Sequence, residues 1–209
     1  YPVTDIGFEI RGVGRGTVRC VIDTVSRSGP FHERLDDGFP VDADGQVVGW
    51  IDDMDTFPRV LGHNEPGAWC FGRNTGRGHL ATGTRDWEDY TLNTDMMVYV
   101  ADAAGVMLRY QGLQRYLALV KTPESIKVVR MLYGEETLFE QDVRWETGEF
   151  HQIRIVAKDR EVRYFVDESL LYAHSEDVLL SGGAGLLVQS GVAGIRSFDV
   201  EGHTIVPAV

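Results

Sequence analysis

Hydrophobic and polar residues alternate along much of this chain, with the period of two that indicates strands buried on one face. In 153–157, for example, Ile153, Ile155 and Ala157 fall on one side and Arg154 and Val156 on the other. The best helix candidate, 175–180, amounts to one turn at most. The pattern therefore predicts an all-β protein.

The predicted strands follow one another regularly from residue 68, with glycines such as Gly72 and Gly105 at the breaks. A spacing of about ten residues, with one buried face per sheet, is typical of two sheets packed face to face. We therefore predict a two-sheet antiparallel jelly-roll sandwich. Its strands are expected at 68–73, 78–82, 90–100, 104–111, 116–121, 125–132, 135–141, 150–158, 161–166, 170–175, 183–188 and 195–201.

The first residues form a separate pattern. Segments 5–10 and 17–23 alternate around the turn at 12–16, which predicts a β-hairpin ahead of the sandwich. Residues 29–66 have little periodicity and read as a linker followed by irregular loops and one or two short strands, including 47–51. We expect two units: a hairpin and linker at 1–35, which either ends a preceding β module or packs on this chain, and the sandwich at 40–205.

The stretch 107–120 carries the most unusual polar residues of the predicted sheet, on two strands joined by a turn at Gly112. Planar donors beside aromatic rings suit a sugar or nucleotide, because the donors bind hydroxyls and the rings stack. A solvated sheet face with stacked Arg and Tyr gives the same pattern. The candidate ligand residues on this stretch are Arg109, Gln111, Arg115 and Tyr116.

Aromatic residues also gather in the first half of the sandwich, where sugars could find stacking faces. Trp69 and Trp87 join the candidate ligand residues on this ground. The competing interpretations are that Trp87 opens a strand and plugs one end of the sandwich, and that Tyr110 and Tyr116 form a cross-strand pair.

Composition and charge restrict the classes of partner that this chain can bind. A net charge of −12 argues against nucleic acid, whose phosphates need a basic face. No apolar run is long enough to cross a membrane. Cys20 and Cys70 lack a zinc-site spacing and are read as buried thiols, with a disulfide between them as the alternative. The chain starts at Tyr1 rather than Met, so we expect a piece of a longer protein, in which a signal peptide would be hidden; a cytoplasmic location is slightly favoured.

Catalytic chemistry finds little support in the sequence. The acids around Trp87, at Asp86, Glu88 and Asp89, occupy an ordinary loop position and not the same-face spacing of paired hydrolase carboxylates. We predict no catalytic residues and no required cofactor. Asp199 is a candidate ligand for a structural calcium, and a turn carboxylate bonded to backbone amides is the alternative.

An ordered set of motifs covers the last two thirds of the chain. Asp86-Trp87-x-x-Tyr90 comes first and Trp145-x-x-Gly148-x-x-His151 later, together with the segments 105–109, 115–119, 163–167, 181–186 and 198–200. This order resembles the concanavalin-A-like jelly-roll modules, which include lectins, glucanases, laminin-G-like and carbohydrate-binding modules. The resemblance implies the sandwich fold and a carbohydrate ligand.

A narrower likeness rests on 1–7, 76–84 and 111–116. These segments resemble the region that follows the catalytic domain in some bacterial ADP-ribosylglycohydrolase-like proteins. The catalytic part of that family is helical and carries metal-binding Asp residues. The pattern of this chain predicts no such helices. The likeness therefore implies an accessory domain partnered by a parent catalytic domain, with a carbohydrate or a nucleotide sugar such as an ADP-ribose-like group as ligand.

Three functions follow for comparison. The first is a non-catalytic binding module accessory to a hydrolase, the second a glycoside hydrolase of the same fold, and the third a structural or self-association module. A groove lined by two facing carboxylates would favour the hydrolase, and a flat apolar convex face would favour self-association.

Overall fold

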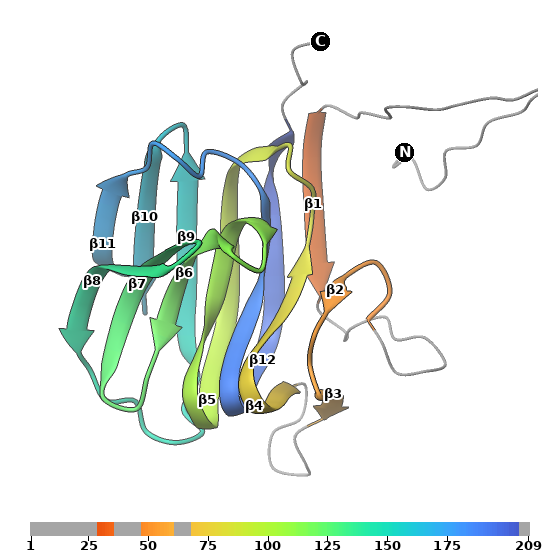
Figure 1. Ribbon diagram of the computed structural model, residues 1–209, viewed down its shortest axis with the longest axis vertical. Coiled ribbons are helices and arrows are strands. Elements are labelled where there is room, and N and C mark those ends of the chain that lie inside the picture. Colours follow the sequence, from red (N-terminus) through yellow and green to blue (C-terminus); the bar gives the residue numbers. More distant parts are fainter. Residues whose placement is uncertain (1–28, 36–46, 61–67, 205–209) are drawn as a thin grey trace, which may run out of the picture.

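The computed structural model describes residues 29–35, 47–60 and 68–204. These residues form antiparallel strands and no helix, so the prediction of an all-β protein is confirmed (Figure 1). The predicted hairpin at 5–23 lies outside the described residues. The strands are β1 (Gly29–Leu35), β2 (Ile51–Asp52), β3 (Thr56–Val60), β4 (Trp69–Thr82), β5 (Trp87–Gly112), β6 (Arg115–Lys121), β7 (Ser125–Leu132), β8 (Glu135–Asp142), β9 (His151–Lys158), β10 (Glu161–Val166), β11 (Ser169–Ser175) and β12 (Gly183–Thr204).

Two layers arise because the long strands β5 and β12 belong to both of them. The first part of β5 pairs with β9, and its last part pairs with β6. Sheet one therefore runs β11-β10-β9-β5-β12-β1, and sheet two runs β8-β7-β6-β5-β12-β4-β2. Figure 1 shows β9, β10 and β11 in one layer and β6, β7 and β8 in the other, with both layers joined to β5 and β12.

The main core lies between the two sheets and follows the predicted alternation. Ile153 and Ile155 of β9 point into it from sheet one, and Leu117 and Leu119 of β6 from sheet two. All four are at most 1% exposed. Burying side chains of this size contributes about 1.5–3 kcal/mol each, which is the main force holding the sheets together.

Three strands are longer than the sequence pattern predicted. β4, β5 and β12 each fuse two expected strands into one, because the chain bends between the sheets without ending its hydrogen bonding. In β12 the pairing with β4 shifts between Gln189 and Gly191, where a bulge accommodates the bend. Gly105, expected at a break, lies inside β5, where a Cβ would come 2.2 Å from the Leu119 carbonyl oxygen. The absence of a side chain at Gly105 therefore allows β5 and β6 to approach each other closely.

The expected boundary before the sandwich also needs correction. Residues Gly29–Leu35, assigned to the linker by their weak periodicity, form β1 and pair in register with β12 from Thr204 to Phe198. Phe31 of β1 stacks on Trp87 with ring centroids 4.0 Å apart. This segment therefore belongs to sheet one.

Candidate functional site

A second apolar cluster covers the face of sheet two that points away from the main core. In β6 the alternation separates the two faces, since Leu117 and Leu119 enter the main core and Tyr116, Ala118 and Val120 enter the second cluster. Both faces of β6 are thus apolar, which explains why its pattern did not indicate a wet side. The remaining members are Ala81, Ala103, Met107, Tyr110, Val129, Met131 and Leu187.

Sheet two curls around this face and makes it concave. β4 and β8 are separated by β12, β5, β6 and β7 in the strand order. Even so, Nη1 of Arg77 on β4 lies 2.7 Å from Oε2 of Glu135 at the start of β8. The turn before β8 is held close by the amide of Tyr133, which donates to the Gln114 carbonyl at 3.0 Å. The ion pair spans the mouth of the concave face.

A pocket of about 340 Å³ opens beside this ion pair. Arg77 organises it with two further hydrogen bonds, from Nη1 to the Tyr116 hydroxyl at 3.1 Å and from Nη2 to the Gln189 side-chain oxygen at 3.1 Å. Nε2 of His79 lies 3.4 Å from the same Tyr116 hydroxyl. The complete lining is Asp53, Arg77, His79, Leu113, Gln114, Tyr116 and Met131.

Burial sets the protonation states of the pocket. It lowers the pKa of His79 to about 4, with the nearby Arg77 acting in the same direction. It raises the pKa of Tyr116, against the opposing effect of Arg77. Both side chains are therefore neutral near pH 7, and Nδ1 of His79 is buried without a hydrogen-bond partner in the described residues. The pocket offers a guanidinium, a phenol, an imidazole, an amide and a carboxylate within one hollow.

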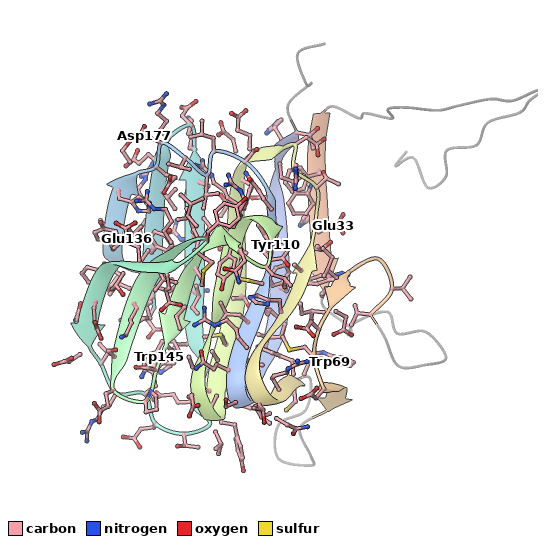
Figure 2. All side chains as sticks on the ribbon, viewed as in Figure 1. Glu33, Trp69, Tyr110, Glu136, Trp145 and Asp177 are labelled. Atoms are coloured by element: carbon pink, nitrogen blue, oxygen red, sulfur yellow. The ribbon has the colours of Figure 1, made fainter. Side chains whose placement is uncertain are left out.

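Aromatic rings pack against one another beside these polar groups. Tyr110 stacks on Tyr116 with centroids 6.1 Å apart, and His79 meets Tyr116 edge-on at 5.4 Å. The predicted cross-strand pair of Tyr110 and Tyr116 is thus present. Figure 2 places Tyr110 near the middle of the molecule, in front of the long strands.

Arg109 is not on this surface, and the expectation that it is exposed is wrong. It is 0% exposed, and its guanidinium donates to the carbonyl oxygens of Leu179 at 2.9 Å and Asp159 at 2.6 Å. The backbone explains the error, because Arg109 has a left-handed φ of 48° at an irregularity in the β5–β6 pairing. That conformation breaks the alternation and turns the side chain inward.

Gln111 and Arg115 hold the turn between β5 and β6 together. Nε of Arg115 donates to the Gln111 side-chain oxygen at 3.1 Å, and the Arg115 guanidinium lies 5.7 Å from the centre of the Tyr133 ring. The Gln111 amide donates to the Ser181 carbonyl at 2.8 Å. Both residues are half-buried and absent from the lining of the pocket at Arg77. Of the four residues predicted on this stretch, the structure places Tyr116 in that pocket.

The two tryptophans lie elsewhere. Trp87 is 0% exposed and stacked on Phe31, so the interpretation of Trp87 as a plug for the sandwich is correct and its assignment to the ligand surface is not. Trp69 is half-buried at the start of β4 and packs against the main core. Figure 2 shows Trp69 well away from Tyr110.

Asp199 pairs with nitrogen donors instead of lying among oxygens. Its Oδ2 is 2.9 Å from Nε2 of His32 and 3.6 Å from Nε of Arg34. A calcium ion takes six to eight oxygen ligands. No cluster of metal-ligating side chains occurs in the described residues. The thiol of Cys70 is buried, and burial raises its pKa to about 11, whereas Cys20 lies outside those residues.

A larger hollow, of about 730 Å³, lies over one end of β1, β12, β5 and β9. Its polar side chains are partly engaged, since His32 bonds Asp199 and Asp89 accepts the Asp159 amide at 2.6 Å. The smaller pocket at Arg77 brings a wider range of donors and acceptors together, so we take it as the candidate site.

Sequence reasoning missed Arg77 and His79, although a signal was present. They flank Gly78, with Arg77 just before and His79 within the strand predicted at 78–82, so in an extended chain they share a face. Leu80 and Ala81, which follow them, are apolar. The two polar residues therefore indicate that one face of this strand changes from polar to apolar along its length. Asp53 also lines the pocket, but it belongs to an irregular segment, and no alternation in the sequence indicated it.

Comparison with known proteins identifies the fold. A scan against protein-family models and a search of curated proteins found no match to the chain. Among solved structures, the carbohydrate-binding module CBM66 from Bacillus subtilis matches with a TM-score of 0.64 and 15% identity, over 74% of this chain and 96% of that chain. The likeness confirms the predicted jelly-roll sandwich.

Enzymes are similar to this chain as well. The Crh5 transglycosylase matches with a TM-score of 0.57 and 10% identity over 85% of each chain. The alginate lyase AlgAT5 from polysaccharide lyase family 7 matches with a TM-score of 0.52 and 15% identity, over 82% of this chain and 84% of that chain. At these identities the likeness shows a shared fold, so function has to be argued from the site. No helix long and apolar enough to span a membrane occurs in the described residues.

Proposed function

We propose that this chain is a non-catalytic carbohydrate-binding module whose ligand occupies the concave face of sheet two, beside Arg77 and Tyr116. The observation that carries the proposal is the pocket in which the Arg77 guanidinium and the His79 imidazole both approach the Tyr116 hydroxyl, so that three different polar groups line one hollow. Sugar hydroxyls both donate and accept hydrogen bonds, and such a mixed set of neutral and charged groups serves both roles. The folds of a carbohydrate-binding module and of two carbohydrate-modifying enzymes support it.

The carboxylates at the site favour binding over hydrolysis. Glycoside hydrolysis needs one carboxylic acid and one carboxylate facing each other across the bond to be cleaved. Here Glu135 is bound to Arg77 at 2.7 Å, and Asp53 is bound to Arg73 at 3.0 Å. Each acid therefore forms an ion pair with its own arginine, which differs from the acid and carboxylate that face each other in a hydrolase.

We further propose that the module is accessory to a parent hydrolase and binds a sugar or an ADP-ribose-like nucleotide sugar. Arg77 suits either ligand, because its fork binds two adjacent hydroxyls or a phosphate. The net charge of −12 disfavours a polyanion, so a single sugar or short oligosaccharide fits better than a nucleic acid.

A binding screen with matched variants tests this function. The chain is screened against a glycan array and against ADP-ribose, and the affinity for each hit is measured by calorimetry. Arg77→Ala should weaken binding about ten- to a hundred-fold, since a hydrogen bond from a charged group contributes about 1.5–3 kcal/mol. Tyr116→Phe should weaken it about two- to ten-fold, since a neutral hydrogen bond contributes about 0.5–1.5 kcal/mol. Arg163→Ala, an exposed arginine of β10, is the matched control and should leave affinity unchanged.

Two results would contradict the proposal. Equal affinity of the wild-type chain and both site variants for a confirmed ligand would place the site elsewhere. Cleavage of a bound glycan that is abolished by Asp53→Asn or Glu135→Gln would make the chain an enzyme.

A further inference from the structure

A separate pocket of about 270 Å³ lies at the other end of β6 from Tyr116. It forms where β5 bends between the two sheets, beside the turn after β6 and the segment before β9. Figure 2 labels Trp145 near the lower end of the molecule, away from Tyr110. The lining is Val98, Tyr99, Val100, Ala101, Lys121, Thr122, Pro123, Trp145 and Thr147.

Lys121 is the unusual member of this lining. The residue is 3% exposed, and its Nζ donates to the carbonyl oxygen of Thr122 and lies 5.7 Å from the centre of the Trp145 ring. Within the described part of the chain, no carboxylate forms an ion pair with it. Burial lowers its pKa, with no acid acting in the opposite direction. Buried ammonium groups are normally paired, because the loss of hydration is costly.

The other walls of the pocket are mainly apolar and prearranged. Trp145 is fixed from behind by His151, which stacks on it with centroids 4.1 Å apart, and His151 is in turn held by Asp167 at 2.7 Å. At the mouth, Tyr99 is 51% exposed and Val100 is 66% exposed. These apolar side chains face solvent beside a cation that has no acid partner among residues 29–35, 47–60 and 68–204. Such a combination contributes little to folding and suits a bound ligand.

We propose that this pocket binds a small organic carboxylate with a ring or short hydrocarbon body. The carboxylate would accept a hydrogen bond from Nζ of Lys121 and neutralise it, and the body would pack against Trp145 and Val100. A monoanion matches the single positive charge. A phosphate group carries nearly two charges and needs several donors, and the pocket supplies one charged donor. This site is independent of the pocket at Arg77 and of the function proposed for it.

The test uses the whole chain and two acids with neutral counterparts. Cyclohexanecarboxylate is compared with cyclohexanecarboxamide, and D-glucuronate with D-glucose. Binding is followed by the indole N–H resonance of Trp145 in nitrogen–proton NMR spectra, assigned with Trp145→Phe. We expect saturable shifts with at least one of the acids and none with the neutral partner. The ratio of the two acid affinities distinguishes an apolar acid from a sugar acid.

Three variants test whether the acid binds through the proposed contact with Lys121. Lys121→Met keeps the stem of the side chain and loses the charge, so acid affinity should fall roughly ten- to a hundred-fold. Val100→Glu adds a negative charge at an exposed position of the mouth and should weaken binding without touching Lys121. Lys127→Met, on β7 and paired with Glu140 at 3.0 Å, is the matched control and should have no effect.

The inference would be overturned by any of three outcomes. These are no saturable shift with either acid, equal binding of acid and neutral partner, and unchanged acid affinity in Val100→Glu together with Lys121→Met. If Lys121→Met fails to fold, the Val100→Glu result decides, because that side chain is largely outside the core.

Discussion

At the scale of single residues, the structure reassigns the arginines. Arg109 has the position of a structural side chain, because it supplies two hydrogen bonds inside the sandwich. Arg77, which was not among the predicted ligand residues, lines the candidate pocket, where Arg109 was expected. The sequence alone does not distinguish the positions of Arg109 and Arg77, because the left-handed φ of 48° at Arg109 leaves no mark on the hydrophobic pattern.

We predict that Arg109→Met destabilises the protein by about 2–4 kcal/mol, because it leaves the carbonyl groups of Leu179 and Asp159 without their donor while nearly conserving volume. Urea unfolding measures this free energy. Arg115→Met, which removes a half-buried side chain from the turn contact with Tyr133, is the control and should cost less than about 1 kcal/mol. Equal effects of the two substitutions would show that Arg109 is not held as described.

His79 predicts a pH dependence of stability. Its pKa is about 4 in the folded protein, against an ordinary value of 6.5 that the unfolded chain retains, so the unfolded chain binds more protons between these values. Stability is therefore full above pH 6.5 and falls as the pH drops towards 4, by about 3 kcal/mol at 1.36 kcal/mol per pKa unit. Urea unfolding at pH 7.0, 5.5 and 4.5 should show this loss, and His79→Gln should remove it. A wild-type pH profile that His79→Gln leaves unchanged would contradict the prediction.

At the scale of elements, the sequence predicted the strands well and their continuity poorly. The strands observed as β6, β7, β9 and β10 lie within about a residue of their predicted bounds, because each has a clear period of two between turn residues. β4, β5 and β12 were each divided in two. Their bends occur at bulges and glycines within continuous pairing, and a glycine that permits close strand approach looks the same in a sequence as one that ends a strand.

The candidate site was harder to predict than the strands for a related reason. Arg77, Tyr116 and Glu135 come from β4, β6 and the start of β8, and they meet because sheet two curls. Alternation tells which residues share a face of one strand, but the curvature of a sheet depends on all its strands together. Tyr116 was predicted from the residues around it in the sequence, whereas Arg77 and Glu135 can be identified as its neighbours only once the fold is known.

Gly105 tests the close approach of β5 and β6. A Cβ at this position would lie 2.2 Å from the Leu119 carbonyl oxygen, which is backbone and cannot rotate away. We predict that Gly105→Ala costs about 1–3 kcal/mol through displacement of the two strands. Gly134→Ala is the matched control, because a Cβ there meets nothing within 4 Å, and thermal unfolding should show little change. Comparable melting temperatures for the two variants would contradict the close contact.

At the scale of the whole molecule, the connection between β11 and β12 joins the sheets and is bonded to both. The chain leaves β11 in sheet one and enters β12 in sheet two through 176–182. The amide of Glu176 donates to the Arg160 carbonyl at 2.7 Å, and the amide of Gly182 donates to the Trp87 carbonyl at 2.8 Å. Arg109 and Gln111 of β5 bond to carbonyls in the same connection, at Leu179 and Ser181. The residues expected to bind a ligand thus fix the closure of the sandwich.

Glu176 is the centre of this connection and carries the last prediction. It is 0% exposed, and its Oε1 accepts the amides of Val178 at 2.7 Å and Leu179 at 3.1 Å, while Arg130 of β7 approaches to 3.4 Å. Burial alone would raise its pKa, but the nearby His174, with Nε2 at 3.6 Å from Oε2, the two amides and Arg130 hold the pKa at about 2. The carboxylate therefore stabilises the fold fully above pH 4.5, and this contribution is lost as the pH falls through 2.

Glu176→Ala should destabilise the protein by about 2–4 kcal/mol at pH 7, because it leaves the amides of Val178 and Leu179 without their acceptor and removes one of the two carboxylates that the half-buried Arg130 contacts. Asp177→Ala, one residue away, removes a carboxylate that is 68% exposed and paired with an exposed Arg160, so it should cost no more than about 1 kcal/mol. Urea unfolding of both variants measures the difference. If Glu176→Ala and Asp177→Ala lower the free energy of unfolding equally, the prediction is wrong, and the link between the two sheets does not depend on the Glu176 carboxylate.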